Sequence, residues 1–432
     1  NGSEKFAKEN RFGFFPSAGF GWIISNEDFF EKNFPSVNLF KLRYTYGLVG
    51  NDGISGAEDR FFYLSEVNLN NGGTGYNWGI NYNNYYNGYN INRYDNESVT
   101  WEVAEKANYG LEVGLFNKLT VLAEYFEEHR KNIYMERQYI PETMGLTTSI
   151  NSNIGEVKAK GIDISIDYNH AFSGDFYITG RGNFTYSTNE ILVNGEPEYQ
   201  NQNLSRIGQP INQQWGYIAE RLFIDEEDIA NSPEQFNGFG STNTYLPGDI
   251  KYKDVNQDGV INQLDQAPIG KPYVPEIVYG FGFSAGYKAF DFSIFMQGAA
   301  RTSFLIEPDK VSPFVNERNA LDIIANNYWS ENNPDPNAFW PRLSVSPIEN
   351  NEKPSTWWLR DGDFLRLKSI EVGYTFPETE TGFFSNLNAR VYCTGLNLLN
   401  FAKFDLWDPE MAGNGLGYPP QRVLNLGVQL KF

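Results

Sequence analysis

Residues 423–432 read VLNLGVQLKF, and this stretch decides the fold class. Apolar residues alternate with polar residues or glycine along it, so that a strand would have one apolar and one polar face. The apolar set is Leu424, Leu426, Val428, Leu430 and Phe432, and the other set is Asn425, Gly427, Gln429 and Lys431. Alternation over about ten residues, repeated along a chain, is typical of the wall of a membrane β-barrel.

The same period of two recurs upstream. Clear examples are residues 41–48, 162–168, 279–287 and 290–297. Residues 364–376 change phase in the middle, and a β-bulge near Lys368 and Ser369 would restore the register. We therefore predict an all-β fold, an antiparallel transmembrane β-barrel wall with about 13–14 strands in this chain.

The connections between the predicted strands fall into two size classes. Short turns are expected at residues 116–118, 169–174 and 288–289. Long loops are expected at about 70–98, 130–156, 189–275, 301–360 and 400–421. Short turns on one side and long loops on the other are typical of outer-membrane barrels, so we expect the long loops to be extracellular.

Composition narrows the function classes. The 432 residues carry a net charge of −20, which argues against nucleic acid as a partner. No apolar run is long enough for a membrane-spanning helix, and residues 1–10 predict no signal peptide in this chain. The single cysteine, Cys393, is expected to be buried or to face outward from the wall.

Enzyme chemistry finds little support in the sequence. The only histidines are His129 and His170, and the chain has no nucleophile elbow, zinc-protease or phosphate-loop motif. Acidic pairs such as Glu127 and Glu128 are expected to be solvated charges. We predict that the chain is not an enzyme.

One loop has the spacing of a calcium site. In DVNQDGVINQLD, positions 1, 3, 5, 7, 9 and 12 of an EF-hand loop correspond to Asp254, Asn256, Asp258, Val260, Asn262 and Asp265. Gly259 stands at position 6, where the chain must turn sharply. The prediction is a Ca²⁺ site that stiffens a long loop, and the alternative is a turn whose Asx side chains cap the backbone.

An aromatic segment is the second candidate site. Residues 72–94 contain Trp78, Tyr82, Tyr85 and Tyr86 in Gly- and Asn-rich sequence. Exposed rings and amides suit contact with a sugar, a peptide or a lid protein, whereas the alternative is a low-complexity loop whose tyrosines pack together.

The positions of two further sets of residues along the chain predict where they lie in the barrel. Trp340, Trp357 and Trp358, near Arg342 and Arg360, are expected in an aromatic girdle at the membrane interface. Alternation places Asp163, Asp167, Arg181 and Glu371 on the lumen side of the wall.

Several ordered blocks of the chain resemble a known family. They are NGSEKFAKENRFGFFPSAGFGWIISNEDFF, LFKLRYTYGLVGNDGI, GDIKYKDVNQDGVINQLDQAPIG with the following PEIVYGFGFSAGYKAFDFSIFMQG, YWSENNPDPNAFWPRLS, DGDFLRLKSIEVGYTFP and DPEMAGNGLGYPPQRVLNLGVQLKF. Over residues 1–432 the chain resembles the carboxy-terminal part of the SusC/RagA-like TonB-dependent transporters of Bacteroidetes, with the plug domain absent from this chain.

The resemblance implies a barrel of about 22 strands in the bacterial outer membrane. It implies active import of oligosaccharides or peptides, energised by the TonB complex through the missing amino-terminal part. The implied partners are a SusD-like surface lipoprotein as lid, outer-membrane lipid, a glycan or peptide solute, and a second transporter–lid pair in a homodimer. Two alternatives stay open at this point: a structural or interaction subunit of a larger outer-membrane assembly, and a passive porin.

Overall fold

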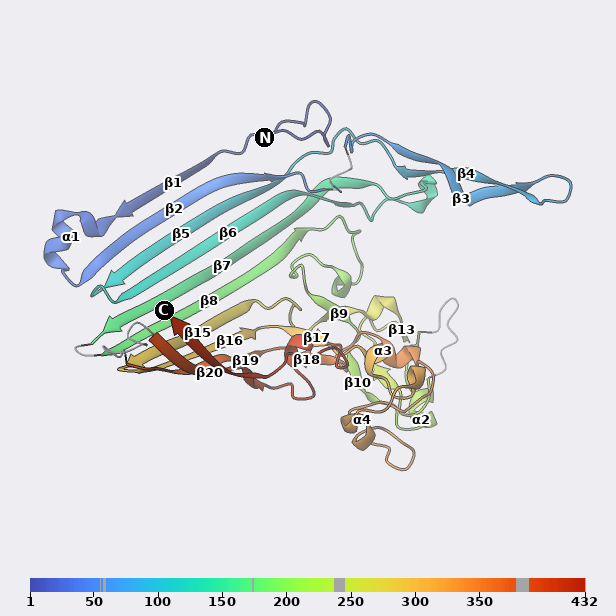
Figure 1. Ribbon diagram of the computed structural model, residues 1–432. Helices are drawn as coiled ribbons and strands as arrows, with labels where there is room; N and C mark the ends of the chain where they lie inside the picture. Colours follow the sequence, from blue (N-terminus) through green and yellow to red (C-terminus); the bar gives the residue numbers. More distant parts are fainter. Residues whose placement is uncertain (55, 57–59, 173–174, 237–244, 378–387, 432) are drawn as a thin grey trace.

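The computed structural model describes residues 1–431 except 55, 57–59, 173–174, 237–244 and 378–387. Phe432, the predicted aromatic end of the last strand, lies outside the described residues. One antiparallel sheet of eleven strands dominates the fold, in the order β1-β2-β5-β6-β7-β8-β15-β16-β19-β20-β21 (Figure 1). Its strands are β1 Ser17–Ile23, β2 Val37–Asn51, β5 Glu102–Leu115, β6 Leu119–Glu136, β7 Asn151–Ala171, β8 Phe176–Val193, β15 Ile277–Tyr287, β16 Phe290–Ala300, β19 Phe364–Thr375, β20 Asn388–Ala402 and β21 Val423–Lys431.

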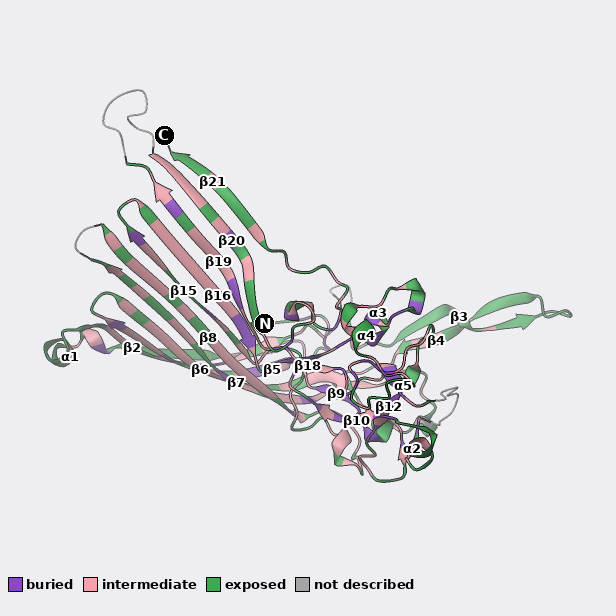
Figure 2. Cartoon of the chain, turned by 90° about the horizontal axis from the view of Figure 1, so that it is seen from below, coloured by how far each residue is buried: buried purple, intermediate pink, exposed green. Residues whose placement is uncertain are grey.

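The two faces of this sheet differ as the alternation predicts. Ile162 of β7 stands opposite Tyr125 of β6 and Tyr186 of β8, and cross-strand partners point to the same face. Following the register from β1 to β21 therefore gives one continuous apolar face and one polar face. The apolar face is exposed, with Leu426 of β21 81% accessible, and Figure 2 shows the resulting stripes of accessibility along each strand. Cys393 is exposed on the apolar face opposite Leu426.

Aromatic rings border the apolar face at both ends. At one end Phe176 contacts Tyr287, and Phe290 contacts Tyr374 at a centroid distance of 4.9 Å. At the other end the tyrosines of neighbouring strands form a row: Tyr44, Tyr109 and Tyr125. The length of β15, 11 residues, gives the height of the apolar face. At about 3.3 Å per residue and a tilt of about 40°, this length covers roughly 25 Å, the height of a lipid-facing band.

The predicted bulge is confirmed. Phe295 of β16 pairs with Ser369, whereas the next residue, Met296, pairs with Leu367. Lys368 is the extra residue, and the register with β20 shifts at the same place. The bulge keeps Leu367 and Ile370 on one face, which explains the change of phase in the sequence.

Connections alternate strictly between the two ends of the sheet. The turn end carries η1 Ile24–Asn26, α1 Asp28–Asn33 and the short links at 116–118 and 288–289. The turn predicted at 169–174 begins later than expected, because β7 runs to Ala171, and its residues 173–174 lie outside the described residues. Phe116, Asn117 and Lys288 have positive φ there, as tight turns between antiparallel strands require. The predicted short turns at 116–118 and 288–289 are thus confirmed. The loop end carries every long connection that the structure describes.

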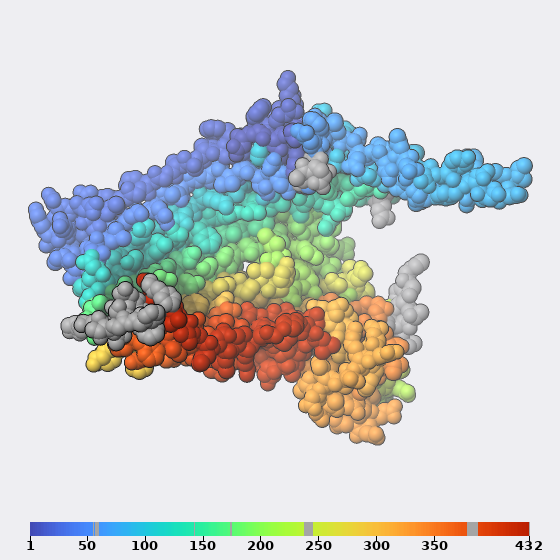
Figure 3. Space-filling model, viewed as in Figure 1, coloured from blue at the N-terminus to red at the C-terminus, as the bar shows by residue number. Residues whose placement is uncertain are grey.

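Residues 66–93 form a separate hairpin at the loop end. Strands β3 Glu66–Trp78 and β4 Asn84–Arg93 pair only with each other, and they project away from the sheet (Figures 1 and 3). The long connection predicted at about 70–98 thus contains a hairpin, which the prediction did not include. Frequent Asn and Gly interrupt the apolar–polar alternation there, so the two strands could not be predicted. The main sheet has eleven strands, fewer than the predicted 13–14.

Three of the other loops condense into one body, which we call the loop domain: residues 194–236, 245–276, 301–363 and 403–422. Its elements are η3 Gln202–Leu204, β9 Gln214–Gly216, β10 Ala219–Leu222, α2 Glu226–Ala230, β11 Glu234–Gln235, β12 Ile250–Tyr252, β13 Val260–Ile261, η4 Gln263–Asp265, β14 Ala267–Ile269, β17 Ser303–Leu305, α3 Pro308–Val311, η5 Val315–Glu317, α4 Asp322–Asn326, α5 Glu349–Glu352, β18 Leu359–Asp361 and η6 Pro409–Met411. The remaining short helix, η2 Glu142–Met144, lies between β6 and β7. Side chains from all three loops share one core, for example Leu222, Trp358 and Phe404.

The aromatic-girdle prediction is wrong, because all three of its tryptophans pack in the loop domain. Trp340 and Trp358 are 5% and 1% exposed. Their rings pack against each other inside the loop domain, with 4.8 Å between the ring centroids. Trp357 packs against the same core. Tryptophan suits a membrane interface and a protein core equally well, so composition alone could not separate the two positions. In the part of the chain that the structure describes, no helix is long and apolar enough to span a membrane.

Candidate functional site

The loop end presents two structures to solution, the β3–β4 hairpin and the loop domain. Two-stranded hairpins are at best marginally stable alone in water, so a hairpin of this length is expected to find a partner surface. All the predicted site residues lie in these two structures. They do not form one site, because Trp78, Tyr82, Tyr85 and Tyr86 belong to the hairpin and residues 254–265 to the loop domain.

The hairpin distributes its predicted contact residues over two faces and a tip. Trp78 pairs with Asn84, Tyr86 with Tyr76, and Tyr85 with Asn77. Since neighbours along a strand alternate, Trp78 and Tyr86 share one face and Tyr85 lies on the other. Tyr82 occupies the tip with a φ of +51°, where its N–H donates to the carbonyl of Gly79 at 3.1 Å.

All four rings are accessible. Trp78 is 59% exposed, and Tyr82 and Tyr86 are 66% and 64% exposed. One face also carries an edge-to-face contact between Tyr76 and Trp78 at 5.6 Å. From Val67 to Asn92 the hairpin contains no charged residue. Ring faces and amides without charge suit a neutral, hydroxyl- or amide-rich surface.

A buried polar network holds the loop domain together. Asn351 donates to Asp249 Oδ1 at 2.8 Å and accepts from the backbone N–H of Ile250 at 2.9 Å. Its own carbonyl accepts from the Trp358 indole at 2.8 Å. Gln235 bonds both Ile250 and Asn350. Buried polar groups that are satisfied in this way specify one arrangement of the loops, because each lost bond would leave a buried group unpaired.

Asp249 is the charge at the centre of this network. Its side chain is fully buried, and burial raises the pKa of its carboxyl above the ordinary value. The guanidinium of Arg342, whose Nε lies 2.8 Å from Oδ1, opposes this rise. The pair joins residues 248–252 to residues 340–342, which belong to a different loop.

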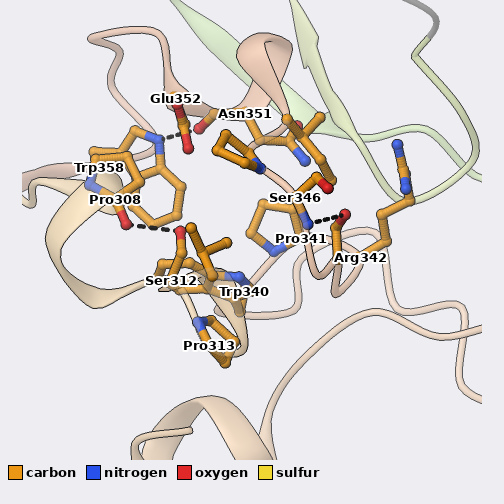
Figure 4. Close-up of a pocket in the computed structure, with 14 residues that line it drawn as sticks. Pro308, Ser312, Pro313, Trp340, Pro341, Arg342, Ser346, Asn351, Glu352 and Trp358 are labelled. Carbon is orange, nitrogen blue, oxygen red and sulfur yellow. Dashed lines mark hydrogen bonds between the residues drawn. The ribbon is translucent and has the colours of Figure 1, made fainter. Parts of the chain in front are cut away.

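A gap near the tryptophans is too small for a solute. It lies between Pro308, Pro313, Pro341 and the rings of Trp340 and Trp358 (Figure 4). Its volume of about 30 Å³ holds roughly one water molecule. This gap belongs to the packing of the loop domain and is not a solute site.

The calcium-type loop uses its side chains on its own backbone. Asp254 accepts from the N–H groups of Gln257 at 2.6 Å and Gly259 at 2.8 Å, and Asp258 accepts from Val260 at 2.9 Å. Gly259 has a φ of +86°, as the sharp turn at position 6 requires.

The last two predicted ligands form a cap on η4. Asn262 accepts from Leu264 N–H, and Asp265 accepts from Asn262 N–H at 2.9 Å and Val255 N–H at 2.8 Å. Asp265 is fully buried. Among the described residues, no three His, Cys, Asp or Glu side chains are grouped to hold a metal. The geometry is that of the self-capping turn, and calcium binding stays a prediction.

The polar face of the sheet carries the predicted lumen residues. Arg181 Nε lies 3.2 Å from Asp167, and Asp163 accepts from Thr185. Glu371 accepts from Arg390, which also binds Asp291. Sequence reasoning missed Arg366, which is 2% exposed and pairs with Asp408 and Glu410 of the loop domain. The sequence could have indicated this residue, because Arg366 lies on the polar face of β19, two residues before the bulge at Lys368.

Comparison with known proteins agrees with this architecture. TonB-dependent receptor P3 of Formosa agariphila is 26% identical over the whole of this chain, and so is the TonB-dependent receptor SusC of Bacteroides thetaiotaomicron. The chain spans 43% and 41% of these relatives, less than half of their length. No protein-family profile matches the chain.

Solved structures show the same fold. The RagAB peptide importer in its open-open state aligns with 99% of this chain at a TM-score of 0.72 and 22% identity, and the chain covers 44% of that structure's chain. The closed-closed state aligns at a TM-score of 0.69. In sequence and in fold, this chain is similar to the SusC/RagA-like TonB-dependent receptors over its whole length.

Proposed function

We propose that these 432 residues are the carboxy-terminal share of the barrel of an outer-membrane importer, with a SusD-like lipoprotein as its lid and TonB as its source of energy. The observation that carries the proposal is the difference between the two faces of the sheet. One face is a continuous apolar belt bordered by aromatic rings, and the other is lined with ion pairs such as Arg390 with Asp291 and Glu371. Such a wall separates lipid from a polar lumen.

The loop domain is the proposed dock for the lid. It is one body with its own core, and Arg366 fastens it to the rim of the wall through Asp408. A rigid dock loses little conformational entropy when a lid binds. The β3–β4 hairpin, at the same end of the sheet, offers Trp78 and Tyr86 to the lid or to the solute. A homodimer of two transporter–lid pairs is part of the same proposal.

The proposed solute is an oligosaccharide or a peptide. One relative by fold is described as a peptide importer, and the exposed rings and amides of the hairpin suit sugars as well as peptides. The choice between these solutes is a question for binding experiments on the full-length protein.

Purification of the full-length protein from outer membranes in mild detergent tests the proposal. Native mass spectrometry is expected to report a chain more than twice the 49.3 kDa of these residues, with a lipoprotein bound. Uptake of the bound solute by cells is expected to stop when TonB is deleted. Uptake that persists without TonB would overturn the energised mechanism.

A structural subunit of a larger outer-membrane assembly is the second candidate. The large docking surface of the loop domain favours it, since such a surface serves an assembly with or without transport. This candidate predicts stable partners in the purified complex and no solute uptake. The two functions therefore give opposite results in the uptake experiment.

A further inference from the structure

A cavity of about 510 Å³ lies at the root of the β3–β4 hairpin, outside the loop domain. The end of β4, the segment that follows it, the end of β6 and the start of β7 form its walls. It is lined by Phe62, Glu66, Asn92, Arg93, Tyr94, Asp95, Asn96, Ser98, Val99, Tyr134, Arg137, Thr148, Ser149, Ile150, Asn151 and Ser152. This volume is within the usual range for small-molecule sites.

Local contacts fix the shape of the cavity. Phe62 and Tyr134 meet edge to face at 5.5 Å, and the Arg93 guanidinium lies 4.2 Å from the centre of the Phe62 ring. Asn96 donates to the carbonyl of Asn151 at 3.1 Å, which joins the segment after the hairpin to β7. The walls are therefore built from elements that are already held together without a ligand.

The two arginines of the cavity differ in their partners. Arg93 lies 3.6 Å from Glu66 and donates to the carbonyl of Leu64. Arg137 has no carboxylate within 4 Å among the described residues, although the chain carries a net charge of −20. Its Nε is buried and has no hydrogen-bond partner there. The side chain as a whole is half-buried and lines the cavity, so its guanidinium can meet an acceptor from outside the chain.

We propose that this cavity binds a carboxylate of an extracellular solute and that Arg137 is its partner. Guanidinium matches carboxylate in charge and in planar, two-pronged geometry. Hydroxyl groups of Ser98, Ser149 and Ser152 can bond neighbouring polar groups, and the Tyr134 ring offers an apolar face. Glu66 and Asp95 also line the cavity, which suits a ligand with one carboxylate rather than a polyanion.

Two sources can supply such a carboxylate: a uronic acid in an oligosaccharide, or the terminus or an acidic side chain of a peptide. In either case the carboxylate is the group that would contact Arg137. The assignment is independent of energised uptake, because binding to the cavity requires neither TonB nor transport.

Isothermal titration of the full-length protein in detergent tests the assignment with two matched probe pairs. One pair is a uronate-containing trisaccharide and the same sugar with its carboxyl reduced to an alcohol. The other is a tripeptide with a free carboxy terminus and the corresponding amide. We expect the wild-type protein to prefer the carboxylate member of at least one pair, and the pair that responds identifies the source.

Substitutions then locate the binding. Arg137→Gln is expected to weaken the preferred carboxylate probe by about ten- to hundredfold, the effect of losing a charge-assisted hydrogen bond. Arg137→Lys keeps the charge and is expected to lose less. Arg422→Gln removes an exposed arginine outside the cavity and is expected to change nothing.

Two results would overturn the proposal. One is a wild-type protein that binds neither carboxylate more tightly than its neutral counterpart, a comparison that needs no variant and no assumption about folding. The other is an Arg137→Gln protein that keeps the full preference for the carboxylate.

Discussion

Asp228 of the loop domain forms ion pairs with two basic side chains. It binds Arg221 Nη2 at 2.8 Å and Lys251 Nζ at 3.1 Å, and it accepts from the backbone N–H of Ile224. The Arg221 guanidinium, with further help from the Ile224 N–H and Lys251, holds the pKa of this carboxyl well below its ordinary value of 3.8. A carboxylate with a lowered pKa stabilises the fold above its ordinary pKa, and this contribution disappears as the pH falls toward the folded pKa.

We expect Asp228→Asn to lower the stability of the loop domain by about 2 kcal/mol near neutral pH. The wild-type domain should lose protection as the pH falls from about 5 to about 2, whereas the variant should lack this part of the loss. Hydrogen exchange of residues 219–252, corrected for intrinsic rates, measures both effects. Asp405→Asn, at an exposed acid, is the control and should leave both unchanged. Equal pH dependence in wild type and Asp228→Asn would contradict the assignment.

Gly248 allows a close approach between two of the loops. Its φ is +86°, and a Cβ at this position would collide with the indole of Trp329. Gly248→Ala is expected to cost at least about 2 kcal/mol, from backbone strain and overpacking together.

Gly208→Ala is the matched control for Gly248→Ala. Gly208 has a φ of +83° with open space around the missing Cβ, so that only the backbone strain should remain. Limited proteolysis of the loop domain compares the two variants. Similar sensitivity in both would show that the contact with Trp329 contributes nothing.

At the scale of elements, the hairpin can be altered without disturbing the sheet. Its strands pair only with each other, so replacing Trp78, Tyr82, Tyr85 and Tyr86 with Ser should leave the sheet and the loop domain folded. We expect the variant to lose affinity for the lid or the solute, because the exposed ring faces are gone. Pull-down of the lid and titration of the solute measure the loss. Ile80→Ser, at a fully exposed aliphatic residue of the tip, should have no effect.

The calcium prediction concerns another element, residues 254–265. If the loop binds Ca²⁺, hydrogen exchange there should slow when calcium is added and recover when a chelator removes it. Asp254→Asn with Asp258→Asn should abolish this response and leave the main sheet folded. If the wild-type loop ignores calcium, the turn is held only by its own hydrogen bonds, such as Asp254 with Gly259 N–H.

How far the sequence predicted each element depends on where its apolar contacts come from. Sheet strands have one apolar and one polar face, so alternation marked β7 and β21 directly, and the break at Lys368 marked the bulge. Loop-domain strands are two to four residues long, and their core joins three loops far apart in sequence, so no period could reveal it. For the candidate site, the sequence indicated the hairpin rings and the calcium-type loop. It did not indicate Arg137, which only the folded chain places in a cavity.

At the scale of the whole molecule, the proposed function makes the eleven strands a boundary between lipid and water, and this can be tested on one strand. Ile166 of β7 lies on the apolar face, between its border rows, and is 43% exposed. Its neighbour Ser165 lies on the polar face opposite Leu122 and Asn183. A lysine on the lipid face near the middle of the bilayer costs about 2–4 kcal/mol, whereas a lysine in the lumen is solvated.

Ile166→Lys in the full-length protein should therefore lower the amount of folded barrel in the outer membrane, and Ser165→Lys should not. The shift in electrophoretic mobility between heated and unheated samples measures the folded fraction for both variants. The two substitutions change adjacent residues to the same side chain, so local strand propensity and net charge nearly cancel in the comparison. If the sensitivity were reversed, the apolar face would be the inside of the wall, and the arrangement of lipid and lumen proposed for this sheet would be inverted.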